Sequence, residues 1–466
     1  MLFNSFEFIF IFLPVVFTVY FLLNQRKLLV ISKYWLVASS LFFYGWWNIA
    51  YLPLMLMSIF VNYGVGNLFN RLTSPTHRWQ ALTVGLLFNF GLLGYFKYAD
   101  FFIMNTNRIF PTDIPLLQLL LPLAISFFTF QQVAYLIDAY RREIHHNTFL
   151  DYVLFVAFFP QLIAGPIVNH HEMMPQFARM RQKVLNYRHI ALGMFIFSIG
   201  LFKKVAIADT FAVWANEGYQ QTQALSFLEG WIVSLSYTFQ LYFDFSGYTD
   251  MAIGVALLFN IQLPRNFNSP YQALNITDFW RRWHMTLTRF LTKYIYIPLG
   301  GNQQGTLRTY LNIFFVFVIS GFWHGAGWTF VFWGILHGLA TLIHRYWQTL
   351  HIHMNRYVAW FITFNFVNIT WVFFRAQTWS EAWHILRAMS GLNGIGFAQI
   401  TMGNLEFIQS LSYILIGLVL VLGFKNSTER MRGFKPTLWT MLISVGLTFY
   451  AITHFNQVSD FLYFNF

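Results

Sequence analysis

Long stretches without a single charged side chain recur along the chain, and they constrain its fold more than any other feature. Residues 309–344 contain no Asp, Glu, Lys or Arg. Similar runs cover residues 8–25, 34–70, 79–96, 114–137, 152–171, 357–374, 407–424 and 436–459. About 20 consecutive apolar residues cross the hydrocarbon core of a bilayer as a helix, so residues 34–70 can supply two spans. The sequence therefore predicts an all-α polytopic membrane protein with about ten to twelve transmembrane helices, some of them broken, re-entrant or lying in the membrane plane.

The overall charge balance agrees with a membrane protein. Charged residues make up 10% of the chain, whereas about 25% is usual in soluble domains. The net charge of +12 also suits a nucleic-acid-binding protein, but no basic tail or nucleic-acid module is visible. We therefore assign the positive charge to cytoplasmic loops that face anionic lipid, and we expect the lipid bilayer, and no nucleic acid, as a partner.

Clusters of basic residues predict the orientation of the chain. Lys and Arg gather at residues 26–33, 179–188 and 425–435, and the positive-inside rule places these segments in the cytoplasm. The N-terminus then lies outside, as does the terminal FLYFNF (residues 461–466), whose aromatic side chains suit an anchor at the membrane interface. No linker or repeat divides the chain, so we expect one integral-membrane domain over residues 1–466.

The absence of cysteine limits the chemistry. It excludes an acyl-cysteine intermediate, disulfides and cysteine-based metal sites.

Two apolar stretches carry polar side chains that a plain spanning helix does not need. In LPLAISFFTFQQ, Pro122 should break or kink a helix, and Gln131 needs hydrogen-bond partners, which a neighbouring helix or a polar cavity could supply. In LYFDFSGYTD, Asp244 and Asp250 stand between apolar runs. Carboxylates at membrane depth usually line a cavity or pair with another charge. The alternative is an interfacial turn at residues 246–247 that places both carboxylates in water.

The stretch NITDFWRRWHMTLTRFL (residues 275–291) predicts a helix that lies in the interface plane. Asn275 and Asp278 resemble a capping box, and Asp278 can pair with Arg282 one turn later. At about 100° per residue, the aromatic and aliphatic side chains fall on one arc and the arginines on the opposite side. A lipid-facing anchor explains the arginines, but it does not explain why His284 borders the apolar arc.

The stretch SGFWHGAGW (residues 320–328) places an imidazole among glycines inside the charge-free run of residues 309–344. Glycines permit close backbone approach or a broken helix. A neutral, desolvated His324 could act as a general base, although a lone histidine between membrane helices is more often structural. His337 is a second candidate, and spacing alone does not rank the two.

Taken together, these stretches resemble the membrane-bound O-acyltransferase superfamily, in its bacterial polysaccharide branch. The resemblance covers nearly the whole chain and rests on the order and spacing of several moderately specific motifs. They include GLLGYFKYADFF, LPLAISFFTFQQVAYLIDAYR, FFPQLIAGP, QLYFDFSGYTDMAIG, RNFNSPY, TDFWRRWHMTLTRFL and SGFWHGAGWTFVFWGILHG. One departure is Ala124, where relatives usually have glycine.

The resemblance implies a ring of transmembrane helices with a tunnel that leads a cytoplasmic acyl donor to a deep histidine. The signature histidine maps onto His324, and the histidine of the WRRWH motif maps onto His284. Arg281 and Arg282 would hold donor phosphates, and an N–H near Gly325 or from a tryptophan would stabilise the oxyanion. The residues expected to line the tunnel or support the histidines are Trp323, Gly325, Arg281, Arg282, Trp283, Asp244, Tyr248, Asp250, Asn268 and Gln131.

The implied function is O-acetyl transfer across the bacterial inner membrane. The expected donor is acetyl-CoA, with no permanently bound cofactor and no metal in the site. The expected acceptor is a polysaccharide, either an alginate-like exopolysaccharide or peptidoglycan, reached through a periplasmic acetyltransferase or esterase partner. A transporter or flippase without acyl chemistry is the alternative from another class, and a non-catalytic scaffold is a third.

Overall fold

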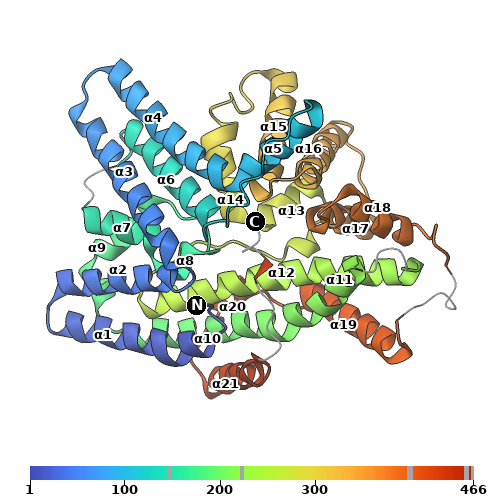
Figure 1. Cartoon of the computed structure of the whole chain (residues 1–466). Coiled ribbons are helices and arrows are strands. Elements are labelled where there is room, and N and C mark those ends of the chain that lie inside the picture. Colours follow the sequence, from blue (N-terminus) through green and yellow to red (C-terminus); the bar gives the residue numbers. More distant parts are fainter. Residues whose placement is uncertain (145–147, 221–224, 396–401, 456–460, 463–466) are drawn as a thin grey trace. The chain divides into compact units, whose positions relative to one another are not determined.

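The computed structural model describes residues 1–144, 148–220, 225–395, 402–455 and 461–462 (Figure 1). These residues form α-helices with short 3₁₀ and π-helical turns, and no β-strand occurs among them. This confirms the predicted all-α fold. Contacts divide the chain into two compact units, unit 1 (Met1–Leu201, Tyr248–Pro264 and Lys435–Val445) and unit 2 (Phe202–Gly247, Arg265–Phe434 and Gly446–Phe466). The expectation of one functional domain over residues 1–466 stays a prediction.

Unit 1 is built mainly from the first ten helices of the chain. They are α1 (Leu13–Gln25), α2 (Leu29–Gly45), α3 (Leu52–Arg71), α4 (Pro75–Leu93), α5 (Ala99–Ile109), α6 (Ile125–Tyr140), α7 (Phe149–Ala157), α8 (Phe159–Leu162), α9 (His170–Ala178) and α10 (Tyr187–Phe202).

The helices that follow belong mainly to unit 2. They are α11 (Asp209–Gln220), α12 (Phe227–Leu258), α13 (Ile276–Arg282), α14 (Met285–Leu291), α15 (Gly305–His324), α16 (Trp328–Thr349), α17 (Arg356–Arg375), α18 (Trp379–Met389), α19 (Asn404–Gly423), α20 (Ser427–Arg432) and α21 (Leu438–Thr453). The end of α12 and the beginning of α21 belong to unit 1.

Seven helical segments of the described chain are long and apolar enough to cross a bilayer. They are Glu7–Gln25, Ile49–Arg71, Pro75–Ile109, Tyr187–Gln220, Gly305–His324, Arg356–Arg375 and Asn404–Gly423, and two shorter apolar helices, α2 and α21, accompany them. The chain is therefore a multi-pass membrane protein, as predicted. The number of spans among the described residues is lower than expected from the charge-free runs, because several of those runs do not form one long helix.

Two predicted spans are wrong for this reason. Residues 111–124 contain no helix, and α6 begins only at Ile125. The helix cannot start earlier because Pro122 supplies no N–H and Ala124 adopts a left-handed conformation with φ of 62°. The run over residues 152–171 is divided among the short helices α7, α8 and α9, since Pro160 and Pro166 interrupt it.

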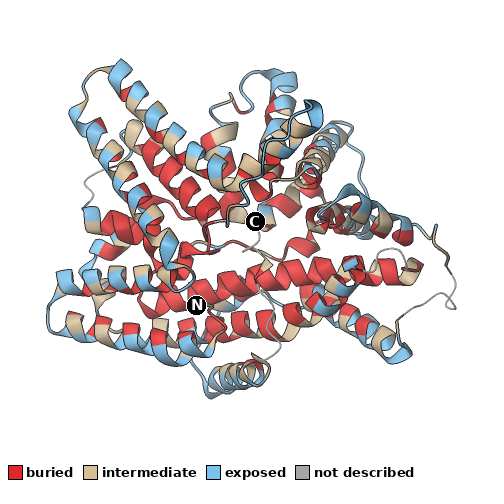
Figure 2. Cartoon of the chain, viewed as in Figure 1, coloured by how far each residue is buried: buried red, intermediate tan, exposed pale blue. Residues whose placement is uncertain are grey.

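Helix α12 is buried along nearly its whole length (Figure 2). It is continuous through residues 246–247, so the alternative of an interfacial turn there is wrong. Asp244 and Asp250 are both buried. In unit 2, Lys204 lies 2.8 Å from Asp244 and 2.7 Å from Asp209. It thus gives these two carboxylates the opposite charge that a buried carboxylate at membrane depth needs.

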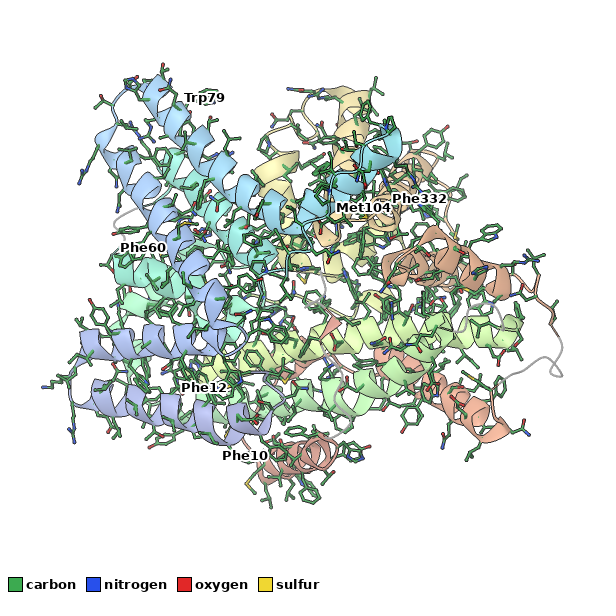
Figure 3. All side chains as sticks on the ribbon, viewed as in Figure 1. Phe10, Phe12, Phe60, Trp79, Met104 and Phe332 are labelled. Atoms are coloured by element: carbon green, nitrogen blue, oxygen red, sulfur yellow. The ribbon has the colours of Figure 1, made fainter. Side chains whose placement is uncertain are left out.

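Large apolar side chains cover much of the outer helix surfaces. Phe60 of α3 and Trp79 of α4, labelled in Figure 3, are more than half exposed. Many Leu, Ile, Val and Phe side chains of α15, α17, α19 and α21 are exposed as well. Such surfaces suit contact with lipid tails, because soluble proteins rarely expose apolar patches of this extent.

Candidate functional site

Helices α15 and α16 form a close hairpin whose connection carries the glycine-rich motif (Figure 1). A Cβ atom on Gly321 would lie 2.3 Å from the carbonyl oxygen of Phe330, and one on Gly334 would lie 2.4 Å from that of Phe317. Only residues without a side chain allow two helix backbones to approach so closely. The glycines thus fix the position of the end of α15.

His324 is the last residue of α15. Its side chain is 2% exposed and packs among aromatic rings, with ring centroids 5.3 Å from Trp333 and 5.2 Å from Phe374. The connection from Gly325 to Gly327 is extended at both ends, and α16 begins at Trp328. The imidazole therefore sits at a helix end, enclosed in an aromatic pocket within unit 2.

The predicted in-plane helix over residues 275–291 is interrupted at His284. Helix α13 ends at Arg282 and α14 begins at Met285, because His284 adopts a left-handed conformation with φ of 42°. The segment before α13 holds this break, since Asn268 donates its N–H to Arg282 and Met285 donates its N–H to Asn266. A non-glycine residue in this conformation costs about 1–3 kcal/mol, and such strain is common at functional sites.

Other local expectations for this stretch are confirmed. The side chain of Asn275 accepts a hydrogen bond from the N–H of Asp278 at 2.8 Å, and Arg282 pairs with Asp278 at 2.9 Å. The side chains of the predicted apolar arc are all buried, namely Phe279, Trp280, Trp283, Leu287, Phe290 and Leu291. They pack against protein within unit 2, as shown by Trp283, whose ring centroid lies 5.0 Å from that of Trp371.

Asn266 determines the chemical state of His284. Its Oδ1 accepts hydrogen bonds from Thr286, through the backbone N–H at 3.3 Å and the hydroxyl at 2.8 Å. His284 Nδ1 lies 3.0 Å from the same oxygen, so Nδ1 carries the proton and Nε2 is left with a lone pair. Full burial lowers the pKa of His284, which lies between α13 and α14 outside the spanning helices, to about 3. His284 is thus neutral at physiological pH, with its proton on Nδ1.

The structure brings the two predicted histidines together from separate elements. The ring centroids of His284 and His324 lie 6.4 Å apart, and His284 also lies 6.3 Å from Trp323. Asn266 was not predicted as a site residue, and the only sequence signal for it was the motif RNFNSPY.

His337 has a structural role. Its Nδ1 accepts a hydrogen bond from the indole N–H of Trp280 at 3.2 Å. Its Nε2 lies 3.0 Å from the hydroxyl of Thr370, which itself donates to the carbonyl of Val367. Nε2 must therefore be the donor to Thr370, and both ring nitrogens are engaged. This ranks His324 above His337 as the reactive candidate.

A small basic pocket borders α13 and α14. It has a volume of about 350 Å³, and its lining includes Arg281, Arg289 and Lys293 together with Thr288 and Trp280. Arg281 is exposed, whereas Arg282 is held by Asp278. The pocket thus gathers three cationic side chains beside the element that carries His284.

The remaining predicted residues occupy different surroundings. Gly325 donates its N–H to the carbonyl of Gly321 at 3.4 Å, and Asn268 accepts a hydrogen bond from the amide of Asn426. Asp244 belongs to the Lys204 cluster. Gln131, Tyr248 and Asp250 are buried residues of unit 1. Their roles, like those of the histidines, stay predictions.

The chain end contributes to the Lys204 cluster. Leu462 donates its N–H to Asp244 at 3.2 Å, and the ring of Phe461 lies 4.8 Å from Lys204 Nζ. Phe461 is fully buried, so the prediction that it anchors at the lipid interface is wrong. The Lys204 ammonium attracts the face of the Phe461 ring, and the Asp244 carboxylate accepts the neighbouring backbone N–H. Residues 463–466 lie outside the described part of the chain.

Comparisons with known proteins agree with the motifs. The sequence model of the membrane-bound O-acyltransferase family matches residues 10–378. A peptidoglycan O-acetyltransferase of Helicobacter pylori is 48% identical over 100% of this chain and 98% of its own length. A probable alginate O-acetylase of Pseudomonas aeruginosa is 38% identical over 90% of this chain and 81% of its own length. A teichoic acid D-alanyltransferase of Bacillus subtilis is 26% identical over 53% of this chain and 66% of its own length. The resemblance seen in the sequence is thereby confirmed.

Proposed function

Because the chain belongs to the membrane-bound O-acyltransferase family, and is thus an O-acyltransferase, we propose that it moves acetyl groups across the bacterial inner membrane for O-acetylation of a polysaccharide. The observation that carries the proposal is the buried pair His284 and His324, in which the state of one imidazole is fixed by Asn266. The relative that is similar over both full lengths is named for peptidoglycan, so peptidoglycan is the favoured acceptor over an alginate-like exopolysaccharide.

The reaction requires a general base and a leaving thiolate. His324 accepts the proton of the attacking hydroxyl as its oxygen bonds to the carbonyl carbon of the acetyl thioester. The tetrahedral intermediate then expels the thiolate as the carbon–sulfur bond breaks, and the proton passes from His324 to that sulfur. His284, whose ring centroid lies 6.4 Å from that of His324, would help to shape the same pocket. General-base catalysis of this kind contributes about 10²–10⁴-fold in rate.

Trp333 is a candidate oxyanion donor. Its ring centroid lies 5.3 Å from that of His324, with the rings perpendicular. Its indole N–H is buried and has no acceptor among the described residues, and a buried donor without a partner costs about 1–3 kcal/mol. A thioester oxygen that accepted this hydrogen bond in the transition state would recover that energy. The N–H of Gly325, by contrast, already donates within α15.

The basic pocket suits the phosphates of acetyl-CoA. Arginine and lysine side chains bind phosphate through charge-assisted hydrogen bonds, and Arg281, Arg289 and Lys293 share one pocket. The side of the membrane that this pocket faces follows from α20, which carries part of a basic cluster predicted to be cytoplasmic. Asn426 caps α20 and donates to Asn268 and Ser269 just before α13. The donor would thus enter from the cytoplasm.

Delivery to the polysaccharide needs a second protein. The acetyl group leaves this chain on the outer side of the membrane, where a periplasmic acetyltransferase or esterase would receive it on a serine hydroxyl and pass it to the glycan. The proposal of such a partner rests on the family resemblance, and specificity for the glycan would reside largely in that partner.

Acetyl transfer in proteoliposomes tests the proposal. Protein reconstituted with radiolabelled acetyl-CoA on one side and a soluble hydroxyl acceptor or the purified partner on the other should transfer label. The His324→Ala variant should lose at least about 10²-fold in rate, while the exposed His351 provides the control His351→Gln with normal transfer. Both variants are compared at equal amounts of inserted protein.

The assay also separates the alternatives. Solute flux without thioester-dependent transfer would support a transporter or flippase. Undiminished transfer in the His324→Ala variant, with the partner present, would support a scaffold and would overturn the catalytic role.

A further inference from the structure

Unit 1 contains a cluster of potential metal ligands that acyl transfer does not use. Asp138 lies near the end of α6, and His170 and His171 begin α9. One donor atom from each side chain lies within 4.8 Å of the other two. Asp138 and His170 are buried, whereas His171 is exposed. The cluster therefore has a protected interior and one side chain open to solvent.

The arrangement of the two histidines is unusual for consecutive residues. Side chains at i and i+1 on a helix point in different directions. Here Asn169, in extended conformation, precedes the first turn of α9, and the ring centroids of His170 and His171 lie 5.3 Å apart with the rings nearly perpendicular. Both imidazoles can thus present a nitrogen toward the carboxylate of Asp138.

The distances fit a divalent metal ion. His170 Nδ1 and Asp138 Oδ2 lie 3.4 Å apart. Two ligands bound at about 2.0–2.2 Å to a tetrahedral Zn²⁺ ion are separated by about 3.3–3.5 Å. His171 offers a nitrogen within 4.8 Å of the other two donor atoms, and its exposure leaves the side chain room to adjust. Three protein ligands leave the fourth position for water.

From this geometry we infer that the chain binds one divalent transition-metal ion, of the Zn²⁺ class, through Asp138, His170 and His171. Two imidazoles and one carboxylate favour such ions over Mg²⁺ or Ca²⁺, which prefer oxygen ligands. The bound ion neutralises the buried carboxylate and ties the end of α6 to the start of α9. The expectation that the acyl-transfer site holds no metal is unaffected, because this cluster is a separate site.

The proposal also accounts for the location of the cluster. Arg141 and Arg142 follow α6 directly, so the positive-inside rule places the end of α6 that carries Asp138 toward the cytoplasm. The ion would be taken from the cytoplasm through His171. An ordinary buried Asp138–His170 ion pair is the competing explanation, and it needs neither His171 nor a metal.

Metal titration of the whole purified protein distinguishes the two explanations. The protein is prepared without a polyhistidine tag, stripped with a chelator and titrated with Zn²⁺, and with Mg²⁺ as a control, by calorimetry. Bound metal is counted by elemental analysis. His171→Gln removes the exposed ligand with little risk to folding, and Asp138→Asn removes the buried one. His77→Gln is the matched control, because His77 is an exposed histidine of the same unit.

One Zn²⁺ per chain should bind to the wild type and to His77→Gln, and it should raise their thermal midpoints. Binding should weaken at least about 10-fold in His171→Gln, while its midpoint without metal stays that of the wild type. Absence of stoichiometric Zn²⁺ in the wild type, or equal affinity in His171→Gln, would overturn the proposal. If Asp138→Asn does not fold, His171→Gln decides the matter. None of these outcomes bears on acetyl transfer, which is measured separately.

Discussion

The close approach of α15 and α16 makes Gly321→Ala a demanding test of how His324, the proposed general base, is positioned. The new Cβ atom would lie 2.3 Å from the carbonyl oxygen of Phe330 and 3.1 Å from the Cα of Gly334. Ordinary contacts begin at 3.4 Å, so the helices must separate by about 3.4 − 2.3 = 1.1 Å. Backbone atoms, unlike the end of a flexible side chain, cannot move without shifting the helix that carries them.

The effect on activity should exceed the effect on stability. Overpacking costs about 1–3 kcal/mol, and the higher helix propensity of alanine returns about 1 kcal/mol, so the variant should fold and insert. His324 is three residues further along the same helix. A displacement of about 1 Å at a reacting group can lower the rate about 100-fold, and we expect a loss of that order in acetyl transfer.

Gly327→Ala is the matched control for this prediction. Gly327 lies in the connection after α15, and its Cβ atom would lie 3.6 Å from the ring of Phe330, an ordinary contact. Its backbone φ of −158° is open to any residue. Both variants are measured for acetyl transfer in proteoliposomes and for thermal midpoint in detergent. Equal rates in the two variants would refute the view that the helix separation positions His324.

Three further predictions concern stability. The pKa of His284 is about 3 in the folded protein and near 6.5 in the unfolded chain, so the free energy of unfolding should fall as pH drops below about 6.5, by about 2 kcal/mol at pH 5. His284→Asn should weaken this dependence of stability on pH. An unchanged dependence, measured by thermal melting at several pH values, would contradict the lowered pKa of His284. Ala124→Gly should raise stability by about 1 kcal/mol, because the left-handed φ of 62° strains alanine; a lower thermal midpoint would count against this. Lys204→Met removes the cation that pairs with two buried carboxylates and should destabilise the protein by about 3–5 kcal/mol. The double variant Lys204→Met, Asp244→Asn should recover part of this loss. No recovery would show that Lys204 and Asp244 are not energetically coupled.

Local features of the sequence were sufficient for much of the fold. The spans at Glu7–Gln25, Arg356–Arg375 and Asn404–Gly423 match charge-free runs closely. The cap at Asn275 and the pair of Asp278 with Arg282 follow from spacing within one helix. Each of these depends on neighbours at most one turn away or on bulk hydrophobicity, which the sequence displays directly.

The candidate site was only partly predictable. The motifs identified His284 and His324, but the arc drawn for residues 275–291 assumed an unbroken helix. The break at His284 is held by Asn266 and Asn268, which are 18 and 16 positions earlier in the chain. Helical periodicity contains no information about such a partner. The same limit applies to His337, whose structural role depends on Trp280 and Thr370.

The sequence by itself determined that this chain spans a membrane, that its residues form helices, and which family motifs it carries. Each of these is a property of a segment's own residues. Tertiary structure alone decided which imidazole is engaged at both nitrogens, which one has a fixed tautomer, and that Lys204 meets Asp244. Those outcomes depend on contacts between segments far apart in the chain, and the energy of a buried hydrogen bond or ion pair exists only once both partners are in place.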